Sequence, residues 1–200
     1  MSVIRFPAVM KYVYRSALFC LNINRPALCL TFDDGPHPDS TPEILKILEK
    51  YSVRALFFCT GKNAELHPEI IKNIRNCGHI TGNHSFSHLD GFCTTTEKYL
   101  EDVEKAAGFT SSSLFRPPYG RLRWRQYANL KMKYTVVLWD LMAEDYDPES
   151  TGDDITEKIL RKIRPGSVII FHDKPECLAK NCLESFIKGA FRLGYTFVLP

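Results

Sequence analysis

Residues 27–36 read Ala-Leu-Cys-Leu-Thr-Phe-Asp-Asp-Gly-Pro, an apolar run that ends in two adjacent carboxylates and a Gly-Pro turn. A short apolar run bounded by turn residues predicts a buried strand, here Ala27–Phe32. Successive side chains at a strand end point to opposite sides. Asp33 and Asp34 can therefore serve different partners, one a metal ion and the other a bound water molecule, as metal-assisted hydrolysis requires.

Further apolar or β-branched runs alternate with segments of helical period along the chain. The predicted strands after the first are Ala55–Cys59, His79–Gly82, Ser113–Arg116, Thr135–Trp139, Ser167–Phe171 and Thr196–Leu199. The predicted helices are Pro42–Tyr51, Pro68–Asn76, one with a capping box at Thr94 and Glu97 that ends at Gly108, Leu122–Lys131, Ile155–Ile163 and Leu183–Arg192. A helix after each of the first six strands predicts a parallel sheet, either an open doubly wound sheet or a closed barrel.

Bulk composition is that of an ordinary globular domain. The chain has 200 residues, with 44% hydrophobic and 24% charged residues, enough for one core without disulfide staples. Seven cysteines cannot all pair within the chain; Cys177 and Cys182 either bridge or stay free. The net charge of +3 is small, and the densest basic segment, Arg121–Arg125, is typical of a solvated helix face. We therefore expect no nucleic-acid partner.

The first residues, Met1–Asn22, mix apolar and basic positions. Their apolar stretches are too short and too interrupted for a signal peptide or a membrane span. We expect residues 1–26 to form an amphipathic extension that packs on a single catalytic domain, residues 27–200.

Polar clusters follow the predicted strands at the same rim. In parallel β/α folds of the barrel type, the carboxyl ends of the strands carry the active site. His84 and His88 lie four residues apart and can share one ion if their loop makes a helical turn. Together with Asp34 they form a set of ligands that suits zinc, with cobalt or another first-row ion as an alternative. The plain alternative is that Asp34 only caps the turn before Gly35.

The remaining polar residues of this rim suggest catalytic roles. Asp33 is the candidate general base, and Arg116 is the natural partner to orient it through a charge-assisted hydrogen bond. The rigid Pro117-Pro118 turn can aim the Tyr119 backbone N–H at a developing oxyanion. His172 ends an apolar strand and is the candidate general acid. Arg116 as a surface residue and His172 as a structural residue are the alternatives.

Four segments resemble, in order and spacing, the motifs of the NodB-type polysaccharide deacetylases, the metal-dependent carbohydrate esterases of family four. They are Thr31–Gly35, His84–His88, Arg116–Gly120 and Ile170–His172, and the resemblance extends from about Ala27 to Pro200. It implies a distorted (β/α)7 barrel in a single NodB homology domain, and removal of N-acetyl groups from N-acetylglucosamine units. It also implies a divalent metal, most simply Zn²⁺, on Asp34, His84 and His88.

The resemblance assigns further roles by position. Asp33 is the base, Arg116 supports it, Tyr119 supplies the oxyanion N–H, and His172 protonates the leaving amine. Ile170 stands where the family commonly has Leu against the acetyl methyl group, and Tyr119 also lines the substrate site.

The motif after the fifth predicted strand departs from the family pattern. The family commonly shows Asp-x-x-Asp-Trp, whereas this chain has Met142, Asp145 and Tyr146 at the three defined positions. Asp145 is expected to tune His172 or Arg116, and Tyr146 to contact the sugar in place of an indole. The change leaves the metal centre intact and bears on the choice of substrate.

The leading expectation is therefore a hydrolase that releases acetate from a chitin-like polymer or oligomer of N-acetylglucosamine. Peptidoglycan, O-acetyl xylan or a cyclic amide are alternative substrates, and a carbohydrate-binding protein with little turnover is the rival from another class. By resemblance we expect an extracellular or cell-wall location. The sequence leaves the oligomeric state open.

Overall fold

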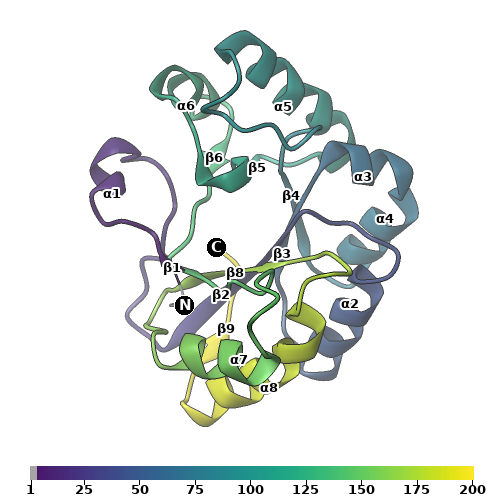
Figure 1. Ribbon diagram of the computed structural model, residues 1–200, viewed down its shortest axis with the longest axis vertical. Helices are drawn as coiled ribbons and strands as arrows, with labels where there is room; N and C mark the ends of the chain where they lie inside the picture. Colours follow the sequence, from purple (N-terminus) through teal and green to yellow (C-terminus); the bar gives the residue numbers. More distant parts are fainter. Residues whose placement is uncertain (1–3) are drawn as a thin grey trace.

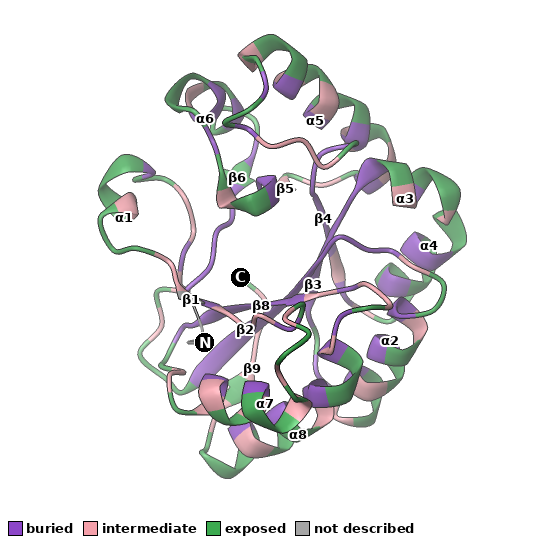
Figure 2. Cartoon of the chain, in the orientation of Figure 1, coloured by how far each residue is buried: buried purple, intermediate pink, exposed green. Residues whose placement is uncertain are grey.

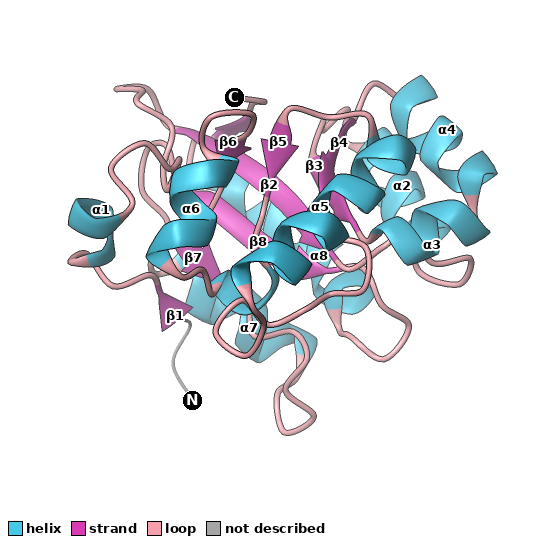
Figure 3. Cartoon of the chain, turned by 90° about the horizontal axis from the view of Figure 1, so that it is seen from above, coloured by secondary structure: helices cyan, strands magenta, loops and turns pink. Residues whose placement is uncertain are grey.

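The computed structural model describes residues 4–200; Met1–Val3, part of the expected N-terminal extension, lie outside the described residues. The strands occupy the middle of the molecule and the helices lie around them (Figure 3). The strands are β1 Ile4–Arg5, β2 Ala27–Asp33, β3 Leu56–Cys59, β4 Ile80–Asn83, β5 Leu114–Phe115, β6 Thr135–Val136, β7 Leu141–Met142, β8 Val168–His172 and β9 Thr196–Phe197. The helices are α1 Met10–Val13, α2 Thr41–Lys50, α3 Gly61–Leu66, α4 Pro68–Asn76, α5 Thr96–Thr110, the 3₁₀ turn η1 Pro118–Gly120, α6 Trp124–Leu130, α7 Gly152–Leu160 and α8 Ala179–Arg192.

The strands form one curved sheet in the order β1-β7-β8-β2-β3-β4-β5-β6, with β9 beside the start of β2 (Figure 1). All pairs of these strands are parallel except β1 with β7. The segment Thr135–Met142 crosses from β5, where Val136 pairs with Phe115, to β8, where Met142 pairs with Ile170. This crossing carries the chain between the two ends of the sheet. The predicted distorted (β/α)7 barrel is thereby confirmed over the open doubly wound sheet.

Alternation along β2 separates the core from the site. Leu28, Leu30 and Phe32 pack in the large cluster that lies between the sheet and helices such as α2 and α8. Cys29 lies on the opposite face, in a smaller cluster with Phe58. Because strand side chains alternate, Thr31 and Asp33 share the face of Cys29. The central strands are buried while the helices show exposed outer faces (Figure 2).

Several predicted boundaries were wrong. The fifth strand is not Thr135–Trp139; it is split into β6 and β7, with no helix between them. α5 passes through Gly108, which has open space around it, and ends at Thr110, with Ser111 as its C-cap at a φ of 45°. Its cap is Thr95, whose hydroxyl accepts the Lys98 N–H, and not Thr94. Each difference comes from local capping or pairing that a hydrophobic pattern does not encode.

Other helices begin earlier than the apolar period suggested. α7 begins at Gly152 because Thr151 and Asp154 form a capping box. α8 begins at Ala179 and not at Leu183. The sequence patterns also missed α3, which has only two buried residues, and α1, which has none. A short helix with few buried side chains carries little periodic signal.

The N-terminal segment joins the domain through β1 and through two buried aromatic side chains. Ile4 pairs with Met142, and Tyr14 and Phe19 lie in a cluster with Trp139. The division at residue 26 stays a prediction. All seven cysteines are free thiols, including Cys177 and Cys182. Within residues 4–200, every helix is too short or too polar to cross a bilayer.

Candidate active site

The predicted polar clusters meet at one cavity of about 590 Å³ at the carboxyl ends of the strands. Most of the predicted site residues line it, whereas Arg116, Asp145 and Ile170 lie buried behind its wall. The lining also includes residues for which the sequence suggested no role in the site. The lining residues include Asp33, Asp34, His84, His88, Tyr119, Met142, Tyr146, His172 and Lys174.

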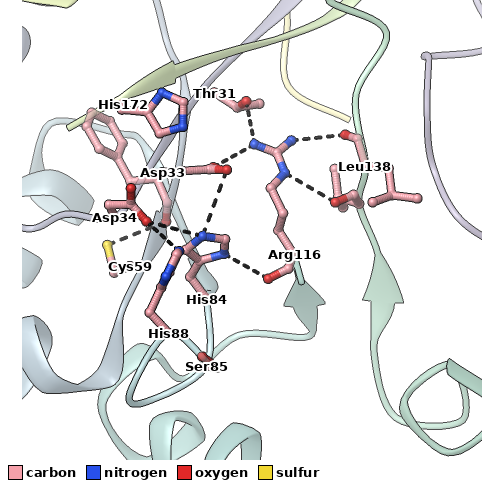
Figure 4. A network of polar contacts seen from close by, with 12 residues as sticks. Thr31, Asp33, Asp34, Cys59, His84, Ser85, His88, Arg116, Leu138 and His172 are labelled. Atoms are coloured by element: carbon pink, nitrogen blue, oxygen red, sulfur yellow. Dashed lines mark hydrogen bonds and ion pairs between the residues drawn. The ribbon is translucent and has the colours of Figure 1, made fainter. Parts of the chain in front are cut away.

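Asp34, His84 and His88 place three ligand atoms within 4.8 Å of one another. Oδ1 of Asp34 is buried without a hydrogen-bond donor, and the Nε2 atoms of His84 and His88 lie 3.4 and 2.9 Å from it. An unpartnered buried carboxylate oxygen that faces two imidazole nitrogens fits a divalent cation. The side chains approach one another from two separate strand ends (Figure 4).

The His84 imidazole is oriented from behind. Its Nδ1 lies 2.8 Å from the Arg116 carbonyl oxygen, a contact in which Nδ1 donates and Nε2 is left with its lone pair. An outer hydrogen bond of this kind sets the tautomer of a metal-binding histidine. Arg116 therefore acts on the site through its backbone as well as through its side chain (Figure 4).

Residues 84–88, the metal loop, are held in a tight backbone turn. Ser85 and His88 have φ values of 60° and 55°, in the left-handed region that residues other than glycine rarely adopt. The Asp102 carboxylate of α5 accepts hydrogen bonds from the N–H groups of Phe86 and Ser87, each at 2.9 Å. Sequence reasoning missed Asp102, because only the fold brings α5 against this loop.

Asn83 stabilises the same loop. It is fully buried, donates to the Val103 carbonyl oxygen at 2.9 Å and accepts the Ser85 N–H at 2.8 Å. Its amide is thus engaged in the structure of the loop.

The electrostatics of Asp34 depend on more than the histidines. Burial raises its pKa, but the His84 and His88 side chains outweigh burial and hold the pKa well below its ordinary value. Its second oxygen, Oδ2, pairs with the Lys174 ammonium at 2.8 Å. Burial lowers the pKa of Lys174, and the Asp34 carboxylate more than compensates, so that the pKa is raised. The sequence contained no motif that pointed to Lys174.

Asp33 is fixed by a buried arginine. Arg116 is fully buried, and its Nη1 donates to Asp33 Oδ1 and to Thr31 Oγ1, both at 2.7 Å. Its other donors reach the carbonyl oxygens of Val137 and Leu138, and its guanidinium lies 4.2 Å from the centre of the Phe58 ring. Each of its three nitrogens thus has an acceptor, as a buried guanidinium requires. The predicted contact between Arg116 and Asp33 is present, and the surface alternative is excluded by the burial.

His172 is paired with Asp145. Its Nδ1 lies 2.7 Å from Oδ1 of the fully buried Asp145, whose Oδ2 accepts the His172 backbone N–H at 2.8 Å. Burial lowers the pKa of His172, but the Asp145 carboxylate outweighs it and the pKa is raised to about 9. Of the two partners expected for Asp145, the structure places His172 beside it. The imidazole is thus protonated at neutral pH with Nε2 left for the cavity.

The predicted substrate-binding residues lie in different positions. Tyr119 is exposed on the rim, has a φ of 59° and packs its ring 4.7 Å from that of His88. Tyr146 packs edge-on against His172 and directs its hydroxyl at Met142, 3.7 Å away. Ile170 is only 1% exposed and lies behind the wall, in the cluster that contains Met142. Its contact with an acetyl methyl group stays a prediction.

Asp173 braces the turn after Asp33 and Asp34. It accepts hydrogen bonds from Ser40 and Thr41 hydroxyls, both at 2.6 Å, and its backbone N–H donates to the Asp33 carbonyl oxygen. Burial raises its pKa to about 6. A Cβ on Gly35 would lie 2.2 Å from its carboxylate, which explains glycine at that position.

Comparison with known proteins matches this geometry to one family. Residues 22–137 match the sequence profile described as polysaccharide deacetylase. The chain is 36% identical over 182 residues to a peptidoglycan-N-acetylglucosamine deacetylase of Bacillus cereus, which covers 85% of the chain but only 63% of that protein. It is 34% identical over 163 residues to a chitooligosaccharide deacetylase of Azorhizobium caulinodans, with 75% of each covered.

A solved structure agrees over nearly the whole length. The crystal structure of a peptidoglycan N-acetylglucosamine deacetylase in complex with 4-naphthalen-1-yl-N-oxidanyl-benzamide superimposes with a TM-score of 0.89. The two chains are 30% identical, and the match covers 96% of this chain and 94% of the other. The chain therefore belongs to the polysaccharide deacetylase family, the NodB-type carbohydrate esterases that its four motifs resemble.

Proposed function

We propose that this protein is a metal-dependent hydrolase that removes N-acetyl groups from N-acetylglucosamine residues of a glycan and releases acetate. The observation that carries the proposal is that one cavity combines three ligands for a cation with a carboxylate and an imidazole held for proton transfer. The two proton-transfer groups, Asp33 and His172, are each fixed by a buried partner of opposite charge.

Asp34, His84 and His88 would hold the divalent metal, with Zn²⁺ as the first candidate and Co²⁺ as the second. When bound there, such an ion polarises a carbonyl group and makes a nearby water molecule more acidic. The family implies a divalent metal. The choice of zinc rests on the mixed nitrogen and oxygen ligand set.

The residues of the chain then carry the proton transfers. Asp33, with Oδ1 held by Arg116, accepts a proton from the water molecule that attacks the acetamide carbon. The Tyr119 N–H stabilises negative charge on the acetamide oxygen. His172 donates its proton to the amide nitrogen as the C–N bond breaks, which yields acetate and a free glucosamine amine. Asp145 keeps His172 protonated for this step.

We propose peptidoglycan as the first substrate and chitooligosaccharides as the second. The sequence motifs alone placed a chitin-like polymer first. Two similar proteins instead favour peptidoglycan. One peptidoglycan-N-acetylglucosamine deacetylase is 36% identical in sequence, and the solved structure of a protein with the same activity superimposes with a TM-score of 0.89. A location outside the cell or in its wall follows from this substrate.

The test is acetate release from a panel of peptidoglycan, chitooligosaccharides, acetylated xylan and cyclic amides, with the metal removed and then restored. We expect zinc-dependent release from one or both N-acetylglucosamine glycans. Release only from the xylan or the cyclic amides would contradict the proposed substrate, and no release from any member of the panel would overturn the proposed activity.

The departures at Met142 and Tyr146 leave one competing function, a carbohydrate-binding protein with little turnover. The observation that favours it is that both residues line the cavity and contact each other where the family has Asp and Trp. It predicts glycan binding without acetate release, so that metal-dependent turnover in the same panel eliminates it.

A further inference from the structure

Lys174 lies in the segment after β8, two residues beyond His172, and reaches back to the metal site. Its Nζ is 2.8 Å from Asp34 Oδ2, although its own side chain is 40% exposed. It lines the main cavity and also a smaller hollow of about 320 Å³, both of which Asp34 lines as well. The ammonium group therefore stands at the junction of two openings, against a carboxylate that is 6% exposed.

The contact divides the Asp34 carboxylate between two tasks. Oδ1 faces Nε2 of His84 and Nε2 of His88, while Oδ2 faces Lys174. The backbone of Asp34 is also fixed, because its carbonyl oxygen accepts a hydrogen bond from Asn63 at 2.9 Å. Only one oxygen of this carboxylate is thus left for a cation.

The charges follow the same division. Asp33 is already paired with Arg116 at 2.7 Å, and Lys174 pairs Asp34 in the same way. Both carboxylates therefore have a positive partner before any cation binds. A divalent ion that enters such a site leaves it with excess positive charge. That excess favours the negative charge that develops on the acetamide oxygen.

We propose that Lys174 is a positioning residue that limits Asp34 to one ligating oxygen, weakens metal binding and strengthens stabilisation of the reaction's developing negative charge. This inference rests on the proposed metal-dependent hydrolysis. It concerns a residue outside the four motifs of the family resemblance. Removal of the Lys174 ammonium has two effects of opposite sign. Metal binding becomes tighter, because Oδ2 of Asp34 is freed and a positive charge is lost, whereas the reaction becomes slower, because the same charge no longer favours the developing negative charge.

The experiment compares Lys174→Met with Lys174→Arg and with Lys180→Met, an exposed lysine of α8 that serves as the matched control. Zinc affinity of the metal-free proteins is measured by competition with a chromophoric chelator, and kcat by acetate release. We expect Lys174→Met to bind zinc on the order of tenfold more tightly and to lose on the order of tenfold in kcat, the scale at which neighbours of metal ligands act. Lys174→Arg, which keeps the charge, and Lys180→Met stay close to the wild type.

A purely structural role would weaken zinc binding and turnover together. Zinc binding in Lys174→Met that is unchanged or weaker than in the wild type, or an unchanged kcat, overturns the inference. If that variant fails to fold, Lys174→Gln replaces it, because it keeps a hydrogen-bond donor without the charge. Failure of the wild type itself to bind zinc or release acetate instead overturns the proposed function, so that the two failures are distinct.

Discussion

Asp33 and Asp34 are neighbours in the chain, yet Asp33 pairs with Arg116 and Asp34 pairs with Lys174. Asp33 lies on the inner face of β2 above Arg116, whereas Asp34 follows the strand with a φ of 78° that turns its side chain toward the two histidines. A left-handed conformation at a residue other than glycine is stored strain that the surrounding contacts must maintain. The pair therefore separates the proposed metal ligand from the proposed base by a single peptide bond.

The first prediction concerns Asp33. Asp33→Asn keeps the hydrogen bond from Arg116 but removes the proton acceptor, so we expect kcat to fall by roughly 10²–10⁴-fold. Zinc affinity should change little, because Asp34 and the histidines are untouched. Acetate release and chelator competition measure the two effects. The exposed Asp39→Asn is the control, and retained kcat in Asp33→Asn would contradict the role of Asp33 as base.

The second prediction concerns pH. His172 must be protonated to donate, and its pKa is raised to about 9, so its contribution is complete at neutral pH and is lost as the pH rises through the pKa. Asp145→Asn removes the charge that raises this pKa, and we expect the alkaline limb of the rate profile to move down by about one to two pH units. A pH profile of kcat/KM measures the shift, and an unmoved alkaline limb would show that His172 is not the acid.

At the residue scale, the sequence singled out the side chains to which we assign the chemistry, and it gave little sign of those that support them. Asp34, His84 and His88 stand out because ligand-type residues follow strand ends at short spacing. Asp102 and Lys174 do not, because a carboxylate on a helix or a lysine in a loop is ordinarily a solvated surface residue. Only their distances to the site distinguish them.

At the scale of elements, α5 holds the metal loop in place. Its Asp102 accepts two backbone N–H groups of the loop, and Val103 accepts the amide of Asn83. A loop that carries two proposed metal ligands in a left-handed turn needs such external support.

The third prediction follows from this contact. Asp102→Ala removes the carboxylate that accepts the Phe86 and Ser87 N–H groups, and Phe86 keeps only its contact with the backbone carbonyl oxygen of residue 102. We therefore expect zinc affinity to fall on the order of tenfold. Chelator competition measures the loss, with Glu101→Ala, an exposed neighbour on α5, as the control. Equal zinc affinity in the two variants would show that the loop holds its shape without α5.

Elements were predictable where a long apolar face repeats and unpredictable where pairing is brief. α4 was predicted with its observed bounds, Pro68–Asn76, because proline begins it and three isoleucines line one face. β6 and β7 have two residues each, too few for a periodic pattern, and they belong to one crossing segment. The register of that segment depends on both ends of the sheet, which no local pattern contains.

For the whole molecule, the metal should couple to stability. A ligand that binds only the folded state at 100 times its Kd adds about 2.7 kcal/mol. We therefore expect zinc to raise the Tm of the metal-free protein by roughly 5–10 °C at that concentration, given the size of the domain. Differential scanning calorimetry measures the shift. His88→Ala should abolish most of it, and an unchanged Tm with zinc would argue against a cation in the folded site.

The curved parallel sheet brings polar clusters that are up to 139 residues apart in the chain, from Asp33 to His172, into register as neighbours on adjacent strands. That convergence was predictable, because alternating strands and helices place all strand ends at one rim. The side of the cavity formed by Met142 and Tyr146 was less predictable from the sequence, since its shape depends on the crossing segment Thr135–Met142.

The most direct measurement is anomalous diffraction at the zinc edge from crystals of the zinc-loaded protein. We predict one strong peak between Asp34, His84 and His88, at roughly 2.0–2.2 Å from one carboxylate oxygen and two imidazole nitrogens. A peak elsewhere, or none between these three side chains in crystals shown to contain zinc, would contradict it.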